Sequence, residues 1–458
     1  MKRTRWSNQF AFILAAIGSA VGLGNIWKFP YIAGENGGGA FVLVYLLCIV
    51  AIGIPIFVAE LFIGQHAQCN AVSAFEKLTF KGTPWRVSGW IGVLAAFLIL
   101  SFYSVVGGWV LSFLAKGITN RFVGQPDEVI RGYMAAIIGD AEASIFWHTV
   151  FMAIVVGIVI MGIKDGIERW NKVLMPGFFA LLIALFIRAA FLPGFQQALT
   201  FLFAPDTSKL TAAGILEAVG HSFFTLSVGM GAIITYGSYL GGKEKLPHIA
   251  FLIGLADTLV ALIAGVVIFS IVFSAGLKPE AGPTLMFQTL PVLFANMAGG
   301  YYIAIAFFLL VLFAAVTSAV SLLEVVVAYV DEHWKISRTK GTLVVGGVVY
   351  VLGLLCATSN NLLSRVTLLG YNFFDFFDTT SSNYLLPIGG LLISLFYGWV
   401  LGKKAIKSTL GKQADNPFWF HSLLWCARVM APVGVFLVLL NSLLPGGILA
   451  LLGIASEP

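Results

Sequence analysis

Long apolar runs separated by short polar segments make up most of the chain. A helix that crosses a bilayer needs about 20 mainly apolar residues, and runs of this length predict eleven transmembrane helices. We expect them near residues 9–30, 39–66, 87–116, 144–162, 166–191, 214–240, 247–276, 300–330, 341–357, 373–401 and 418–443. The pattern therefore predicts an all-α polytopic membrane protein with a single transmembrane domain over residues 1–458.

Two of these runs carry an interruption at mid-membrane depth. The first run contains Ser-Ala-Val-Gly-Leu-Gly-Asn at Ser19–Asn25, and the sixth contains Val-Gly-Met-Gly at Val228–Gly231. Each glycine weakens a helix by about 1 kcal/mol relative to alanine, and Asn25 carries an amide that lipid cannot satisfy. Unpaired backbone groups are tolerated at this depth only where they line a cavity. Matched interruptions therefore indicate a transporter binding site between two repeats.

The two interrupted runs cross the membrane in opposite directions because they are the first and the sixth. This order predicts an inverted repeat, with repeat one near 9–191, repeat two near 214–401 and an additional helix near 418–443. The alternative is that the glycines serve only helix packing, since Gly18 and Gly22 also form a small-xxx-small pattern. The recurrence of the pattern in both runs favours the binding site.

Lysine and arginine residues gather on one side of the predicted spans. Most lie in the N-terminal segment and in every second loop, namely Lys2, Arg3, Arg5, Lys77, Lys81, Arg86, Lys164, Arg169, Lys172, Lys243, Lys245, Lys335, Arg338, Lys340, Lys403, Lys404, Lys407 and Lys412. Positively charged loops stay in the cytoplasm. We therefore expect a multi-pass protein of the cell inner (plasma) membrane, with a cytoplasmic N-terminus and an extracytoplasmic C-terminus.

The composition supports this interpretation and excludes soluble classes. Hydrophobic residues make up 59% of the chain, charged residues 10%, and the mean hydropathy is +0.94, whereas soluble proteins are about 25% charged. The lipid bilayer is thus an expected partner. The net charge of +6 follows from the topology, so we expect no nucleic-acid partner. The four cysteines lack the close spacing of a metal or redox motif.

Three acidic residues lie within apolar runs, where an ionised group needs a partner or a water-filled cavity. Asp257 is a hard oxygen donor that suits an alkali cation, although it is also a candidate cap for a kinked helix. Glu60 follows Gly53 and Pro55 and is better explained as an acceptor for N–H groups freed at a helix break. For Glu324 the sequence leaves two interpretations open, the inner half of a pathway or a side chain that snorkels to the interface.

The eighth run places two adjacent hydroxyl groups, Thr317 and Ser318, at membrane depth. Such side chains commonly bond to their own helix. The break in the first run changes this context, because it frees the carbonyls of Gly18 and Val21. Together with the Ala314 carbonyl, these groups provide an oxygen shell for a sodium ion.

The run Gly18–Pro30, followed by Glu35–Phe41, is the most specific segment of the chain. It resembles the neurotransmitter:sodium symporters in their compact, eleven-helix, LeuT-type bacterial form. The segment Ser222–Ser227 and the spacing from Gly166 to Pro176 agree with this resemblance. The resemblance covers nearly the whole chain and implies a LeuT-like 5+5 inverted repeat with broken helices 1 and 6.

The resemblance implies sodium-coupled amino-acid uptake by alternating access, with two sodium ions and no organic cofactor. Sodium site one would comprise Ala20, Asn25, Thr225 and Asp257, with the substrate carboxylate as a further ligand. Sodium site two would comprise Gly18, Val21, Ala314, Thr317 and Ser318. The substrate carboxylate would meet Leu23, Gly24 and Tyr103. The amine would meet Ala20, Phe224, Thr225 and Ser227. The substrate side chain would contact Ile99, Met230, Ser318 and Leu322.

The resemblance also implies an outer and an inner gate. The outer gate would pair Lys28 with Asp378, while Tyr103 and Phe224 close over the substrate. Lysine stands where arginine is commoner, so the bidentate fork of a guanidinium is lost.

The inner gate would pair Arg3 with Glu332, with Trp6 packed nearby. Glutamate stands here in place of the usual aspartate, and the neighbouring Asp331 is an alternative partner for Arg3.

Two departures from the family pattern bear on ion and substrate choice. Asp257 occupies a position where many members have asparagine, so it supplies the charge that animal members obtain from chloride, and we expect chloride-independent transport. The first run has no carboxylate at Ala20–Val21 to pair with a monoamine. The second departure is Met230, where some relatives have phenylalanine. Flexible methionine adapts to varied shapes, and with Ile99 and Leu322 it predicts an apolar pocket. We therefore expect a zwitterionic hydrophobic amino acid, up to the size of an aromatic one.

Three competing functions are distinguishable. An intramembrane enzyme is disfavoured because the sequence has no His-Glu-X-X-His motif and no evident catalytic dyad near the breaks. A channel fits paired broken helices less well than alternating access does. A sodium-independent amino-acid exchanger on the same scaffold is the main alternative, and it would not need the oxygen ligands Thr317 and Ser318.

Overall fold

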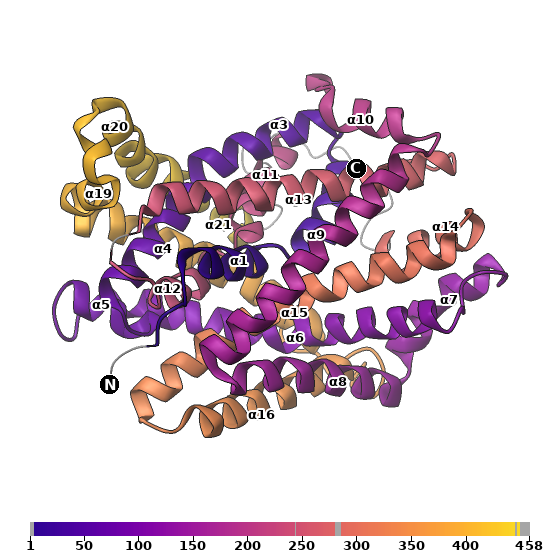
Figure 1. Cartoon of the computed structure of the whole chain (residues 1–458), viewed down its shortest axis with the longest axis horizontal. Helices are drawn as coiled ribbons and strands as arrows, with labels where there is room; N and C mark the ends of the chain where they lie inside the picture. The colour runs from indigo at the N-terminus through magenta and orange to yellow at the C-terminus, as the bar shows by residue number, and fades with distance from the viewer. Residues whose placement is uncertain (1–3, 243, 280–284, 445–446, 449–458) are drawn as a thin grey trace.

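The computed structural model describes residues 4–242, 244–279, 285–444 and 447–448. Its long helices run mostly along the longest axis of the molecule, and α1 (Gln9–Ala20) lies in the middle of the bundle (Figure 1). In Figure 1, α9 (Arg169–Ala190) and α13 (Leu246–Ser274) lie beside α1, and both contact it, as does α15 (Gly300–Trp334). The apolar runs therefore surround a central helix that is buried from Leu14 to Ala20.

The first predicted span is broken as expected. The helix α1 begins where the Asn8 side chain accepts a hydrogen bond from the Ala11 N–H (2.8 Å) and ends at Val21, whose backbone is extended. The chain continues as the π-helical turn η1 (Gly24–Lys28) and α2 (Phe29–Glu35). The two parts of the span meet at 49°. The glycines of this segment thus interrupt the helix, as their low helix propensity predicts.

The remaining elements before the second break are mainly long helices joined by short ones. They are α3 (Gly39–Cys48), η2 (Ile49–Gly53), α4 (Ile54–Ala67), α5 (Ala71–Leu78), α6 (Arg86–Ile118), α7 (Asp127–Gly139), α8 (Ala141–Ile160), η3 (Ile163–Glu168), α9 (Arg169–Ala190), α10 (Phe195–Phe203) and η4 (Thr207–Lys209). The π-helical turn η3 precedes α9, which contains Pro176. Proline lacks the N–H that continues the helix ladder, so this span has two weak points, η3 at its start and Pro176 within α9.

The sixth predicted span forms two short helices, α11 (Ala212–Thr225) and α12 (Ala232–Gly237). The later elements are α13 (Leu246–Ser274), η6 (Leu285–Thr289), α14 (Leu290–Asn296), α15 (Gly300–Trp334), α16 (Arg338–Ala357), α17 (Phe373–Thr379), η7 (Thr380–Leu385), α18 (Leu386–Leu395), η8 (Phe396–Leu401), α19 (Gly402–Leu410), η9 (Gly411–Asp415), α20 (Pro417–Trp425), η10 (Cys426–Met430) and α21 (Ala431–Leu443). These segments continue the alternation of apolar helices and polar turns seen in the sequence.

Among the described residues, nine helices are long and apolar enough to cross a membrane, and the bent pair α1 and α2 brings the number to ten. The all-α polytopic architecture is confirmed. The count of eleven stays a prediction, because the eleventh span is the broken pair α11 and α12, and each of these helices is too short to span alone.

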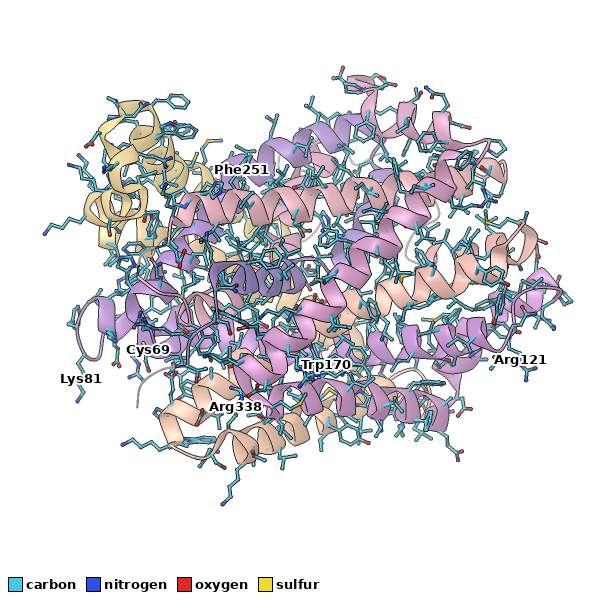
Figure 2. The ribbon with its side chains drawn as sticks, viewed as in Figure 1. Cys69, Lys81, Arg121, Trp170, Phe251 and Arg338 are labelled. Atoms are coloured by element: carbon cyan, nitrogen blue, oxygen red, sulfur yellow. The ribbon has the colours of Figure 1, made fainter. Side chains whose placement is uncertain are left out.

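Charged residues lie at both ends of the bundle in the predicted alternation. Lys81 and Arg338, assigned to the side of the N-terminus, lie toward the end of the molecule that holds the N-terminus, and Arg121 lies at the opposite end (Figure 2). The structure contains no membrane, so the assignment of the N-terminal end to the cytoplasm stays a prediction.

Candidate substrate and ion site

The two helix breaks meet in the centre of the bundle. The Ser227 hydroxyl donates a hydrogen bond to the Ser19 carbonyl (2.8 Å), which joins the breaks directly. In the second break Ser227, Gly229 and Gly231 all have positive φ angles (54°, 88° and 72°). Glycine adopts such angles at little cost, so the sequence Val-Gly-Met-Gly lets the chain leave one helix and enter the next.

Glu60 satisfies backbone groups that the second break releases. Its carboxylate accepts hydrogen bonds from the Gly229 N–H (2.6 Å) and the Ile234 N–H (3.3 Å), and the side chain is fully buried. Hydrogen bonds to a charged group contribute about 1.5–3 kcal/mol each. The structural interpretation of Glu60 is therefore confirmed, and this carboxylate is engaged by the backbone.

A cavity of about 60 Å³ lies between the breaks. Its lining includes every predicted substrate-binding residue, namely Ala20, Leu23, Gly24, Ile99, Tyr103, Phe224, Thr225, Ser227, Met230, Ser318 and Leu322. It also includes four residues that the sequence analysis missed, Ser19, Gly22, Phe102 and Ser321. Ser321 follows Ser318 by one helical turn, so the 3.6-residue period was an available signal for it.

The lining of the cavity combines polar groups with apolar side chains. The Tyr103 hydroxyl is buried, and its polar neighbours are the Ser318 hydroxyl and the Leu23 backbone N–H. It lies beside Gly22, since a Cβ added to this glycine would stand 3.3 Å from it. The side chains of Ile99, Phe102 and Met230 line the same cavity, and its lining contains no acidic or basic residue. A tyrosine hydroxyl both donates and accepts hydrogen bonds, so the lining around Tyr103 is suited to a polar group of a ligand.

The residues of predicted sodium site one converge around Asp257. Its carboxylate is fully buried and accepts hydrogen bonds from Asn25 Nδ2 (2.7 Å, to Oδ1) and from the Thr225 hydroxyl (2.9 Å, to Oδ2). Asn25 Nδ2 also lies 3.0 Å from Thr225 Oγ1. Ala20 lines the adjoining cavity. The broken first span, α11 and α13 therefore each contribute one polar side chain to a single buried cluster, which goes beyond the capping of one kinked helix.

The residues of predicted sodium site two bring α1 and α15 together. The Ser318 hydroxyl lies 3.2 Å from the Val21 carbonyl oxygen and 3.4 Å from that of Gly18. The Thr317 hydroxyl lies 3.1 Å from the Ala314 carbonyl oxygen. Thr317 thus bonds within its own helix, as the alternative interpretation states, whereas Ser318 reaches across to the carbonyls at the end of α1. Ser318 thus groups three oxygen atoms from the two helices, and Thr317 and Ala314 add two more on α15.

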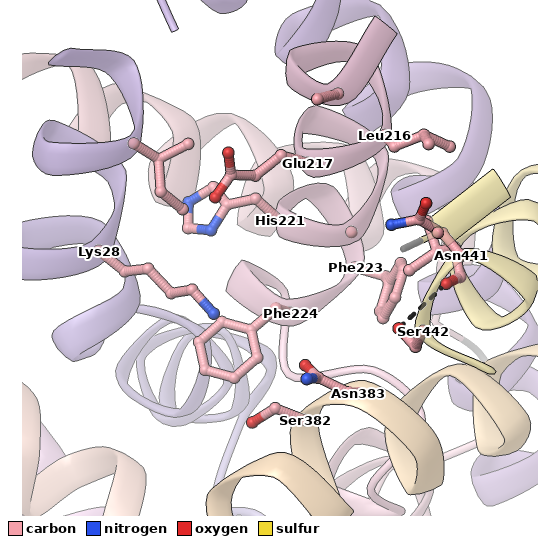
Figure 3. A pocket seen from close by; sticks show the side chains of 15 residues that line it. Lys28, Leu216, Glu217, His221, Phe223, Phe224, Ser382, Asn383, Asn441 and Ser442 are labelled. Carbon is pink, nitrogen blue, oxygen red and sulfur yellow. Dashed lines mark hydrogen bonds between the residues drawn. The ribbon is translucent and has the colours of Figure 1, made fainter. Parts of the chain in front are cut away.

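A second cavity of about 510 Å³ adjoins the first at Phe224, which lines both. Figure 3 shows the Lys28 ammonium group directed at the Phe224 ring, and Nζ lies 4.5 Å from the ring centroid. Asp378 instead accepts a hydrogen bond from the Ser382 hydroxyl (2.8 Å). The predicted Lys28–Asp378 ion pair is therefore not formed in the described structure, because the ammonium group makes a cation–π contact beside an open cavity.

The other end of the site is closed by the N-terminal segment. The Trp6 side chain is buried, and its Nε1–H donates to the Tyr236 carbonyl (3.1 Å). Glu332 accepts hydrogen bonds from the backbone N–H of Asn70 (2.8 Å) and from its side chain (2.9 Å). Arg3 lies outside the described residues, so the Arg3–Glu332 pair stays a prediction.

Glu324, for which the sequence left two interpretations open, is buried and paired at this inner end. It forms an ion pair with Arg338 (2.6 Å) and accepts a hydrogen bond from the Tyr239 hydroxyl (2.6 Å). The interpretation that it snorkels to the interface is therefore wrong.

Comparison with known proteins agrees with this geometry. The sodium:neurotransmitter symporter family matches residues 3–125 and 136–446. The chain is 40% identical to the sodium-dependent transporter YhdH of Bacillus subtilis over 442 residues, which covers 96% of this chain and 98% of that protein. It is 35% identical to a sodium-dependent transporter of Haemophilus influenzae over 455 residues, with 96% and 98% covered.

A solved structure extends the likeness to the whole fold. The crystal structure of MhsT in complex with L-phenylalanine superposes with a TM-score of 0.88 at 44% sequence identity, and the match covers 96% of this chain and 100% of that chain. The predicted LeuT-like fold with two broken helices is confirmed. With its matched breaks and buried oxygen clusters, the chain belongs to the sodium:neurotransmitter symporter family, a family of membrane transporters.

Proposed function

We propose that this protein takes up hydrophobic L-amino acids, including aromatic ones, together with sodium ions by alternating access. The observation that carries this proposal is the cavity between the two breaks, whose lining combines the Tyr103 hydroxyl with apolar side chains and contains no charged side chain. Such a cavity suits a zwitterion, whose two charges are met by backbone groups and hydroxyls. It does not suit a monoamine, which would require a carboxylate. MhsT, whose structure contains L-phenylalanine, supports this class of substrate.

The size of the cavity limits how a large substrate is held. A volume of about 60 Å³ has room for a few water molecules, since one water requires about 10–15 Å³ by this measure. An aromatic side chain therefore requires the lining to move. Met230 is unbranched and flexible, and Phe224 separates this cavity from the larger outer one. These two side chains are the parts of the wall that we expect to adjust.

Two sodium ions complete the proposed site. Asp257 provides the negative charge of site one, and the substrate carboxylate joins it there, which couples ion binding to substrate binding. Site two contains neutral oxygens from α1 and α15, so an ion there holds the broken first span against the eighth. Both ions and the substrate stabilise the same packed arrangement of the breaks, and this shared stabilisation is the basis of symport.

The two ends of the site differ in the described structure. Trp6 is buried beneath the site, whereas the cavity of about 510 Å³ lies on the other side of Phe224. We assign the end with the N-terminus to the cytoplasm on the positive-inside rule. In this orientation the substrate enters through the outer cavity, and release requires that the N-terminal segment leave its position.

Direct binding measurements test the proposal. Purified protein is mixed with each of the twenty amino acids in sodium buffer and in potassium buffer, and binding is followed by scintillation proximity or calorimetry. We expect sodium-dependent binding of hydrophobic amino acids, with aromatic ones among them. Equal binding in both buffers would support the sodium-independent exchanger, and binding only of charged or small polar amino acids would refute the proposed substrate class.

Chloride is expected to be dispensable. Asp257 already supplies a fixed negative charge beside the first ion, so a second anion adds nothing there. Uptake into proteoliposomes is expected to proceed at the same rate, within about twofold, in sodium chloride and in sodium gluconate. A strong requirement for chloride would show that Asp257 is not the charge that balances the first ion.

A further inference from the structure

Asn171 lies on α9, on the side of this helix that faces the second ion site. Its side chain is buried, with 2% of its surface exposed. Its Oδ1 atom has no hydrogen-bond partner among the residues that the structure describes. A buried polar atom without a partner destabilises the fold. The Asn171 oxygen is therefore free to accept a contact from a ligand.

The orientation of the amide is determined by its other end. Asn171 Nδ2 donates a hydrogen bond to the Ile167 carbonyl (2.8 Å). The reverse orientation would place Oδ1 against this carbonyl oxygen, and two acceptors repel each other. The Asn171 oxygen therefore points away from its own helix and toward α1.

The oxygen points at residues of the second ion site. A Cβ atom added to Gly18 would collide with Asn171 Oδ1 and would stand 3.1 Å from Thr317 Cβ and 3.1 Å from Met175 Sδ. Gly18 and Thr317 both belong to predicted sodium site two, whose oxygens come from α1 and α15. The Asn171 oxygen thus approaches the same site from a third helix, and a side chain at position 18 would block this approach.

We propose that Asn171 Oδ1 is a further oxygen ligand of the cation at the second site. This inference rests on the proposed sodium coupling and extends it to α9, a helix that the sequence analysis did not include among the ion ligands. A neutral amide oxygen is a hard donor of the kind that suits an alkali cation. The ligand satisfies the Asn171 oxygen, and Asn171 links the ion to the span that contains η3 and Pro176.

Two substitutions with opposite expected effects test the proposal. Asn171→Leu keeps the branched shape and removes the oxygen. We expect it to raise the sodium concentration that gives half-maximal substrate binding by about tenfold, a change typical of losing a supporting group at a metal site. Asn171→Asp keeps an oxygen and adds a charge, and we expect it to lower that concentration. A purely structural role would predict that both variants bind sodium more weakly, because both lose the bond to the Ile167 carbonyl.

Met175→Leu is the matched control, since Met175 also faces Gly18 but offers no oxygen. We expect its half-maximal sodium concentration to stay within about twofold of wild type, as volume-conserving core changes cost little. Unchanged sodium dependence in Asn171→Leu would overturn this inference, and so would an equal rise of the half-maximal sodium concentration in Met175→Leu. Neither result would overturn the proposed function. If Asn171→Leu does not fold, the test is the Asn171→Asp variant. Sodium binding by this variant that is no tighter than that of wild type would overturn the inference. Sodium-independent binding by the wild-type chain would overturn the proposed function itself.

Discussion

Asp257→Ala is expected to abolish sodium-dependent substrate binding. Asp257 is fully buried and is the acidic member of a cluster with Asn25 and Thr225. Removing one partner of a buried charged contact costs about 3–5 kcal/mol, which corresponds to a loss of affinity of about 100-fold or more. The measurement is binding of a radiolabelled hydrophobic amino acid over a range of sodium concentrations.

The neighbouring Thr258→Ala serves as the control for this experiment. The Thr258 hydroxyl bonds to the Gly254 carbonyl of its own helix (2.8 Å), so its loss removes a local contact from the same helix and no ion ligand. We expect binding within about threefold of wild type. Near-normal sodium-dependent affinity in Asp257→Ala would remove the first ion site from the proposal, whatever the control shows.

Gly22→Ala is expected to have a comparably large effect through space alone. The added Cβ would stand 2.7 Å from Ser318 Oγ and 3.3 Å from the Tyr103 hydroxyl, inside the cavity between the breaks. Overpacking of this kind costs about 1–3 kcal/mol, and the methyl group also occupies ligand space. We expect substrate binding to fall by about 10–100-fold, as measured by the same sodium-dependent assay.

Gly390→Ala separates this effect from the general cost of changing a buried glycine. Gly390 is also buried, in α18, and a Cβ there would meet its nearest neighbour at 3.9 Å, an ordinary contact. Binding by this variant is expected to match that of wild type. Equal losses in the two variants would show that the region around Gly22 does not form the substrate site.

The local features of the site could be predicted because they depend on short stretches of sequence. The first helix ends at Ala20, just before Gly22 and Gly24, and the second break contains Gly229 and Gly231, which have positive φ angles. Helix propensity and positive φ angles are properties of a residue and its neighbours. The resemblance to a family then predicted which residues on distant helices contribute to the site. The structure places every residue assigned to substrate binding around one cavity.

Contacts between helices could not be predicted in the same way. Lysine in place of arginine indicated a weaker outer gate, but only the packed structure shows that Lys28 lies over the Phe224 ring while Asp378 bonds to Ser382. The sequence does not indicate that Arg338 is the partner of Glu324, because this ion pair depends on how α15 and α16 pack against each other. A flexible side chain has several partners within reach, and the choice depends on the geometry of the whole bundle.

By itself the sequence determined the membrane class, the positions of both helix breaks and the buried carboxylates, because hydrophobicity and backbone propensity act locally. Only the tertiary structure decided which polar atoms meet, including Asn25 with Asp257 and the free oxygen of Asn171 with Gly18. These residues are far apart in the chain, and they meet because the bundle must pack its broken spans around backbone groups that lipid cannot satisfy.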